Sequence, residues 1–109
     1  MIVIGANSSD RRAYEMCRLA FDKYRDAPEA IRAHALAQIE GWRRTEVCSA
    51  WYSERWGELL AMPIESCARI VMADTNEGQA LRANNPFPGI FTRRERDQIQ
   101  AAGREKVGV

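Results

Sequence analysis

The chain has 109 residues, of which 46% are hydrophobic and 28% charged, and its formal net charge is +1. Such a length is typical of a single domain, and the composition excludes a disordered chain, which combines low hydrophobicity with high net charge. Sixteen basic residues against fifteen acidic ones leave no overall positive field that would attract nucleic acid or an anionic membrane. Fourteen of the basic residues are arginine, which either suits bidentate contacts with carboxylates and phosphates or reflects a GC-rich genome.

Three cysteines, Cys17, Cys48 and Cys67, are scattered along the chain without any CxxC pair. An odd number of unpaired cysteines argues against a disulfide framework and favours the reducing cytoplasm. No run approaches the roughly 18 apolar residues of a membrane span, and the opening MIVIG lacks the basic start of a signal peptide. We therefore expect a cytoplasmic protein without a membrane partner.

The first predicted element is a loose N-terminal arm over residues 1–7, whose MIVIG start favours extended structure. Ser8 or Ser9 then offers an N-cap, and Asp10 suits the first turn of a helix because the helix dipole favours acid there. The apolar residues that follow recur at helical spacing on one face: Ala13, Cys17, Ala20, Phe21 and Tyr24.

The central segment, residues 28–62, contains no strong helix breaker before Pro63. Asp26, Pro28 and Glu29 form a start signal resembling a capping box. One straight helix over this segment would measure about 52 Å, whereas a compact domain of this size has a radius of gyration near 13 Å. The sequence therefore predicts either a kink near Gly41 or a helix that projects and pairs with another chain.

Two shorter helices are predicted next. The first begins at Pro63, and its apolar stripe consists of Ile64, Cys67, Ala68, Val71 and Met72. Asp74 or Thr75 caps the second, which ends near Asn84.

A last helix follows the irregular NNPFPG segment, in which Phe87, Ile90 and Phe91 are expected to fix the loop to the core. Thr92 and Glu95 form a capping box, which predicts a helix from Arg93 to about Ala102. Gly103 marks its predicted end, and residues 104–109 form a loose tail. The whole pattern predicts an all-α single domain, a small bundle of four to five helices.

No pattern of residues indicates catalysis, a cofactor or a metal. The single histidine, His34, and the three scattered cysteines lack the spacing of a zinc site. No nucleophile motif such as GxSxG occurs, and the carboxylates of Glu54 and Glu58 are expected to face solvent or pair with arginines. We therefore expect a protein that is not an enzyme, with no cofactor and no metal.

The densest feature is a mixture of aromatic and arginine residues in the central segment. Tryptophan, tyrosine and arginine dominate interface energetics, although a hydrophobic core would also explain the aromatic residues. The interface candidates are Trp42, Arg43, Arg44, Trp51, Tyr52, Arg55 and Trp56. They favour a small adaptor, inhibitor or regulator that binds another protein, with a homodimer as one form. Small accessory proteins of phages or mobile elements share this profile.

Three arginines at the start of the last helix carry the alternative interpretation. Arg93, Arg94 and Arg96 lie where the helix dipole disfavours positive charge. Acidic neighbours such as Glu95 and Asp97, or a bound anion, would offset that repulsion. Solvated arginines, an acidic protein surface and nucleic-acid phosphate all remain open, so the alternative function is a regulator that binds DNA or RNA.

Overall fold

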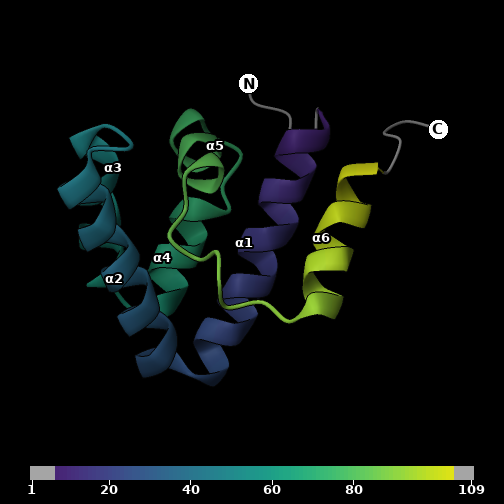
Figure 1. Cartoon of the computed structure of the whole chain (residues 1–109), viewed down its shortest axis with the longest axis horizontal. Helices are drawn as coiled ribbons and strands as arrows, with labels where there is room; N and C mark the ends of the chain where they lie inside the picture. The colour runs from purple at the N-terminus through teal and green to yellow at the C-terminus, as the bar shows by residue number, and fades with distance from the viewer. Residues whose placement is uncertain (1–6, 105–109) are drawn as a thin grey trace.

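Six α-helices make up residues 7–104, the part of the chain that the computed structural model describes, and these residues contain no strand. The helices are α1 (Ser8–Asp26), α2 (Pro28–Thr45), α3 (Ala50–Leu60), α4 (Ile64–Val71), α5 (Asn76–Ala83) and α6 (Arg93–Arg104) (Figure 1). The all-α prediction is confirmed, but the predicted count of four to five helices is too low. The extra helix comes from the central segment, which folds as two helices.

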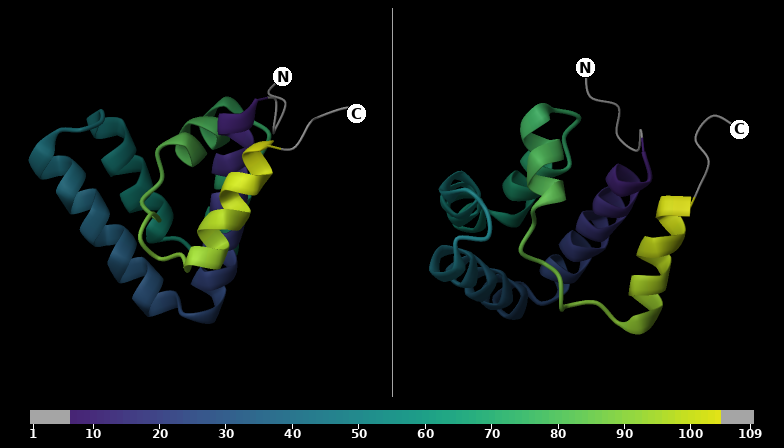
Figure 2. Two further views of the ribbon diagram at one scale, coloured as in Figure 1. Left: turned by 45° about the vertical axis from the view of Figure 1, so that its right-hand side comes forward. Right: turned by 45° about the horizontal axis from the view of Figure 1, so that its top comes forward.

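The long central helix is the main error of the sequence interpretation. The chain leaves the α2 helix at Glu46, whose φ of 53° is left-handed, and its N–H donates to Trp42 O at 2.8 Å. Helix α3 starts after Ser49, which has extended backbone angles. The two helices therefore form an antiparallel hairpin (Figure 2). Gly41, the predicted kink, lies inside α2 instead.

Replacing Gly41 by alanine should stabilise the protein. A Cβ atom at Gly41 would meet only the Arg44 guanidinium, at 3.9 Å, and alanine is favoured over glycine inside a helix by about 0.5–1 kcal/mol. We expect the free energy of unfolding to rise by about that amount in urea titrations. Gly78→Ala is the matched control: its Cβ would lie 2.4 Å from Ala73 O, so stability should fall. A Gly41→Ala variant that loses stability would show that α2 needs a glycine there.

The core is built around aromatic side chains from three parts of the chain. The Phe87 ring packs edge-on against Phe21 of α1 and Trp56 of α3, at centroid distances of 5.7 and 5.5 Å. Trp56 also donates its Nε1–H to Asn84 O at 2.9 Å. Phe87 and Phe91 are buried, and Ile90 packs against them, so the expectation that they fix the loop to the core is confirmed.

Helices α1 and α6 pack side by side and antiparallel (Figures 1 and 2). Gly103 is the second-to-last residue of α6, and a Cβ there would come within 2.6 Å of Arg12 Cγ. Helix α6 therefore runs two residues past the predicted end near Ala102, and it includes Arg104, the first residue of the predicted tail. The remainder of the tail, 105–109, lies outside the described residues.

The start of α1 also differs from the prediction. Asn7, and not Ser8 or Ser9, is the N-cap, because its Oδ1 accepts the Asp10 N–H at 2.9 Å. Asn7 therefore belongs to the helix start, while the other residues of the predicted arm, 1–6, lie outside the described range. The predicted cap at Asp26 is absent, since Asp26 ends α1 and the N-cap of α2 is Ala27, without a side-chain hydrogen bond.

Arginines from neighbouring helices donate to the carbonyls at the C-terminal ends of three helices. The bonds are Arg32 Nε to Leu60 O of α3 (2.9 Å), Arg82 Nη1 to Val71 O of α4 (2.7 Å) and Arg11 Nη2 to Gly103 O of α6 (2.9 Å). The last carbonyls of a helix have no partner inside it, and its dipole favours positive charge there. A guanidinium satisfies both requirements, so part of the arginine excess has an intramolecular role.

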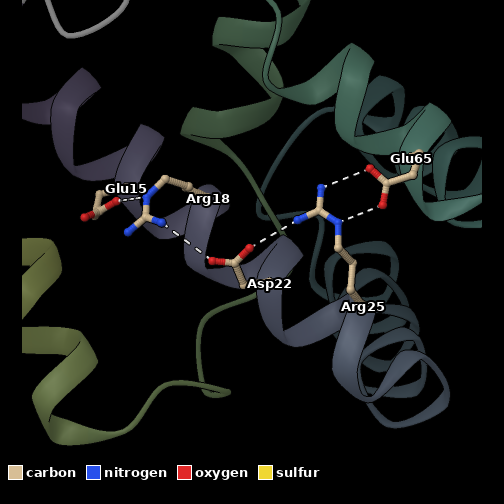
Figure 3. A network of polar contacts seen from close by, with 5 residues as sticks. All are labelled: Glu15, Arg18, Asp22, Arg25 and Glu65. Carbon is tan, nitrogen blue, oxygen red and sulfur yellow. Dashed lines mark hydrogen bonds and ion pairs between the residues drawn. The ribbon is translucent and has the colours of Figure 1, made fainter.

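A row of ion pairs runs along α1 and reaches α4 (Figure 3). Arg18 pairs with Glu15 and Asp22, and Arg25 pairs with Asp22. The Arg25 guanidinium also donates two hydrogen bonds, of 2.7 and 3.1 Å, to the Glu65 carboxylate of α4. Apart from Glu15 these side chains are exposed, so each pair contributes about 0–1 kcal/mol. Only the Arg25–Glu65 pair joins α1 to α4.

Candidate protein-binding surface

Exposed apolar side chains gather where α2 turns into α3. Val47 is 68% exposed and Trp51 is 42% exposed, while Trp42 and Cys48 beside them are half-buried. Val47 lies in the turn after Glu46, outside both helices, so no helix face buries it. We call Trp42, Val47, Cys48 and Trp51 the apolar tip. Single exposed apolar residues are ordinary, but a group of them marks an interaction surface.

An open groove of about 410 Å³ starts at the apolar tip. Trp42, Val47 and Cys48 are among its lining residues. Met16 of α1 and Ile99 of α6 also line it. Its size is within the range of ligand-binding clefts, about 300–1,000 Å³. The hairpin, α1 and α6 are thus joined by one surface.

Trp42 also lines a second hollow. This hollow, of about 380 Å³, lies between the end of α2 and the start of α3, and its lining includes Arg43 and Glu54. Trp42 and Cys48 therefore line both concave surfaces.

Two of the predicted interface residues form the charged edge of the tip. Arg43 and Arg44 are exposed on the last turn of α2. Arg43 lies 3.7 Å from Glu40, a loose surface pair. Tyr52 is half-buried, and its ring is 5.0 Å edge-on from that of Trp51. These side chains surround the tip at the end of the hairpin.

The other two predicted interface residues are engaged inside the fold. Arg55 pairs with Glu77 of α5 at 2.9 Å and with Glu58 at 3.2 Å, so it joins α3 to α5. Trp56 has no exposed surface and belongs to the core. Trp56 cannot contact a partner in this fold, and for this residue the alternative core interpretation applies.

The arginines at the start of α6 do not act together. Arg96 donates to Phe91 O at 2.9 Å and so holds the preceding loop. Arg93 and Arg94 are exposed, and the described part of the chain offers neither of them a hydrogen-bond or ion-pair partner. Of the three arginines at the start of α6, only Arg93 and Arg94 therefore have guanidinium groups available to an external anion.

The anion at the start of α6 is supplied by the chain itself. The predicted capping box is confirmed: Thr92 N–H donates to Glu95 Oε1 at 2.8 Å, and Glu95 N–H donates to Thr92 Oγ1 at 3.1 Å. Lys23 of α1 adds an ion pair to Glu95 at 2.9 Å. The bond from the Thr92 backbone, followed by the one from Lys23, lowers the pKa of the Glu95 carboxyl. Glu95 thus remains ionised and offsets the nearby arginines.

The side chains of Cys17, Cys67 and His34, whose types can act as nucleophiles or metal ligands, are engaged in the packing of the fold. Burial raises the pKa of the Cys17 and Cys67 thiols to about 12, so both stay protonated. The His34 Nε2–H donates to Pro88 O at 2.7 Å and fastens the loop before α6 to α2. Within residues 7–104, no three His, Cys, Asp or Glu side chains gather as a metal site.

Of the groove residues, the sequence interpretation identified only Trp42 as a functional candidate. Met16, Ile99 and Arg12 carry no signal of a binding site in the sequence, because α1 and α6 meet the hairpin only in the folded chain.

Comparisons with protein-family models, curated proteins and solved structures found no match to this chain. None of the helices within residues 7–104 combines the length with the apolar character that crossing a lipid bilayer requires. Function is therefore argued from the described surface alone.

Proposed function

We propose that this chain is a small non-enzymatic protein that binds another protein, as an adaptor, inhibitor or regulator, through its apolar tip. The observation that carries the proposal is the exposure of Val47 and Trp51 around the turn of a hairpin that buries Ile39 and Trp56 in the core. Tryptophan and arginine are the residues that most often dominate binding energy. Arg43 and Arg44 supply the charged rim that surrounds such a centre.

The cytoplasm is the proposed setting, because all three cysteines are free thiols and Cys48 is partly exposed. An oxidising compartment would favour pairing of such thiols.

Replacing Trp51 by alanine should reduce the recovery of a protein partner about 10-fold or more, because interface tryptophans commonly contribute at least 2 kcal/mol. The measurement is quantitative mass spectrometry of proteins captured from the native cell by the whole chain, with sedimentation to detect self-association. Leu36→Ala is the matched control, since Leu36 is 46% exposed but lies away from the tip on α2.

Equal recovery by wild type and Trp51→Ala would contradict the proposal. The alternative, a regulator of DNA or RNA, is favoured only by the unpaired guanidinium groups of Arg93 and Arg94. Oligonucleotide binding that weakens steeply with salt, with a smaller slope in the Arg93→Ala, Arg94→Ala variant, would replace protein binding as the function.

A further inference from the structure

We propose that the groove beside the apolar tip takes an acidic amphipathic segment of the partner, with apolar anchors along the groove and a carboxylate at Arg12. This inference rests on the proposed function and names the chemistry of the partner. It follows from the shape of the groove, from the charges that line it and from the contacts of Arg12.

The groove is lined by both apolar and polar side chains. Its apolar residues include Met16, Trp42, Val47 and Ile99, and its polar ones include Ser9, Asn84 and Gln100. Three secondary-structure units contribute these apolar side chains, so the surface is continuous across the hairpin, α1 and α6. An amphipathic helix binds in a groove through apolar anchors about one turn apart, and its polar side chains can meet polar residues of the lining.

The charged residues that line the groove are all positive. Two arginines, Arg12 and Arg82, line the groove, and no aspartate or glutamate does, although the chain has 15 acidic residues among 109. The Arg82 guanidinium is turned away, toward Val71 O and Ala73 O, at 2.7 and 2.8 Å. Arg12 is therefore the cation that a bound segment would meet.

Arg12 has no carboxylate partner within residues 7–104. Its one hydrogen bond goes to Ser8 Oγ, at a long 3.4 Å, and its aliphatic stem packs against Gly103 of α6. The side chain is held in place, while no carboxylate among residues 7–104 supplies a counter-charge to its head. A carboxylate on the partner would supply that counter-charge, and charge-assisted bonds of arginine are stronger than neutral ones.

Other occupants fit the groove less well. A nucleic-acid strand needs several cations along its backbone, whereas this groove presents one. A second copy that covered the groove with the same surface, about a two-fold axis, would bring arginines and no carboxylate to Arg12, because the lining contains no aspartate or glutamate. A partner segment that carries both apolar and acidic residues matches the groove without either difficulty.

The test selects peptides from a displayed library of random sequences on the whole wild-type chain. We expect the enriched peptides to combine large apolar residues with aspartate or glutamate. For a synthetic peptide of the enriched sequence, Val47→Glu should weaken binding about 10-fold, because it removes an apolar anchor and adds a repelling carboxylate. Arg12→Glu should weaken it by a similar factor, and moderate salt should weaken the wild-type complex.

Matched controls separate the groove from general effects of charge. Leu36→Glu introduces the same carboxylate as Val47→Glu at an exposed apolar residue outside the groove, and Arg69→Glu makes the same charge reversal as Arg12→Glu on exposed α4 surface. Both controls should bind as the wild type does, and thermal melting should show all four variants folded. Val47 is 68% exposed, so its replacement leaves the core untouched.

Enrichment of basic or uncharged peptides, or no enrichment, would overturn the inference. So would equal binding by wild type and Val47→Glu, or a dimer that Val47→Glu dissociates and that excludes the peptides. These outcomes differ from failure of the proposed function. If Trp51→Ala still loses the native partner, protein binding at the tip stands and only the acidic segment is wrong.

Discussion

Replacing Trp56 by alanine should lower the free energy of unfolding by about 3–5 kcal/mol, the range for large aromatic residues in cores. Trp56 is fully buried, packs edge-on against Phe87 and donates to Asn84 O. Its removal leaves a cavity and an unpaired carbonyl at once. A domain of this kind is stable by only about 5–15 kcal/mol, so the variant should unfold at much lower urea concentration, as followed by circular dichroism.

Trp51→Ala is the matched control for that experiment. Trp51 lies on the same helix and is 42% exposed, so its replacement should lower the free energy of unfolding by less than about 1 kcal/mol. Losses of equal size would show that Trp51 is as much a part of the core as Trp56. A small loss for Trp56→Ala would contradict the packing described for the loop before α6.

The different burial of Trp51 and Trp56 also determines what a loss of partner binding means for each variant. Because Trp51→Ala should remain folded, any loss of partner it causes reports on the surface. Trp56→Ala would lose the partner by unfolding, which says nothing about contact. The sequence-based set of interface candidates mixed both kinds of residue, and only burial separates them.

Local signals predicted the fold well where the relevant contacts are local. The Thr92–Glu95 capping box and the Thr75 cap, whose Oγ1 accepts the Gly78 N–H, are contained within single turns. The turn between α2 and α3 has no such signal. It uses a left-handed Glu46, where a glycine or asparagine would have marked the break. Without that mark the two helices were predicted as one segment.

The position of each tryptophan could not be predicted for a related reason. Trp51 and Trp56 are five residues apart, which places them on different faces of α3. Periodicity shows that the faces differ, but which one is buried depends on where Phe87 and the loop pack. The groove could not be predicted from the sequence either, because Arg12 and Val47 line one surface only once α1 packs against the hairpin.

The second large effect is expected from Arg82, a buried cation without a carboxylate. Its side chain is 3% exposed and lies over the Tyr14 ring at 5.7 Å, while Nη1 bonds Val71 O and Ala73 O. The C-terminal end of α4 therefore provides the negative partner that an acidic side chain usually provides. The close approach of Gly78 to Ala73 O holds α5 at the distance that this arrangement needs.

Arg82→Met should lower the free energy of unfolding by about 2–4 kcal/mol, because a buried carbonyl and a partly buried one lose their donor while the apolar length of the side chain is retained. Urea titration is the measurement, and Arg69→Met, on the exposed side of α4, is the control expected to stay within about 0.5 kcal/mol of wild type. A loss below about 1 kcal/mol for Arg82→Met would mean that the desolvation of the guanidinium cancels its bonds. In that case Arg82 would contribute to the geometry of the α4 end and not to stability, and the similar contacts of Arg11 and Arg32 would need the same reinterpretation.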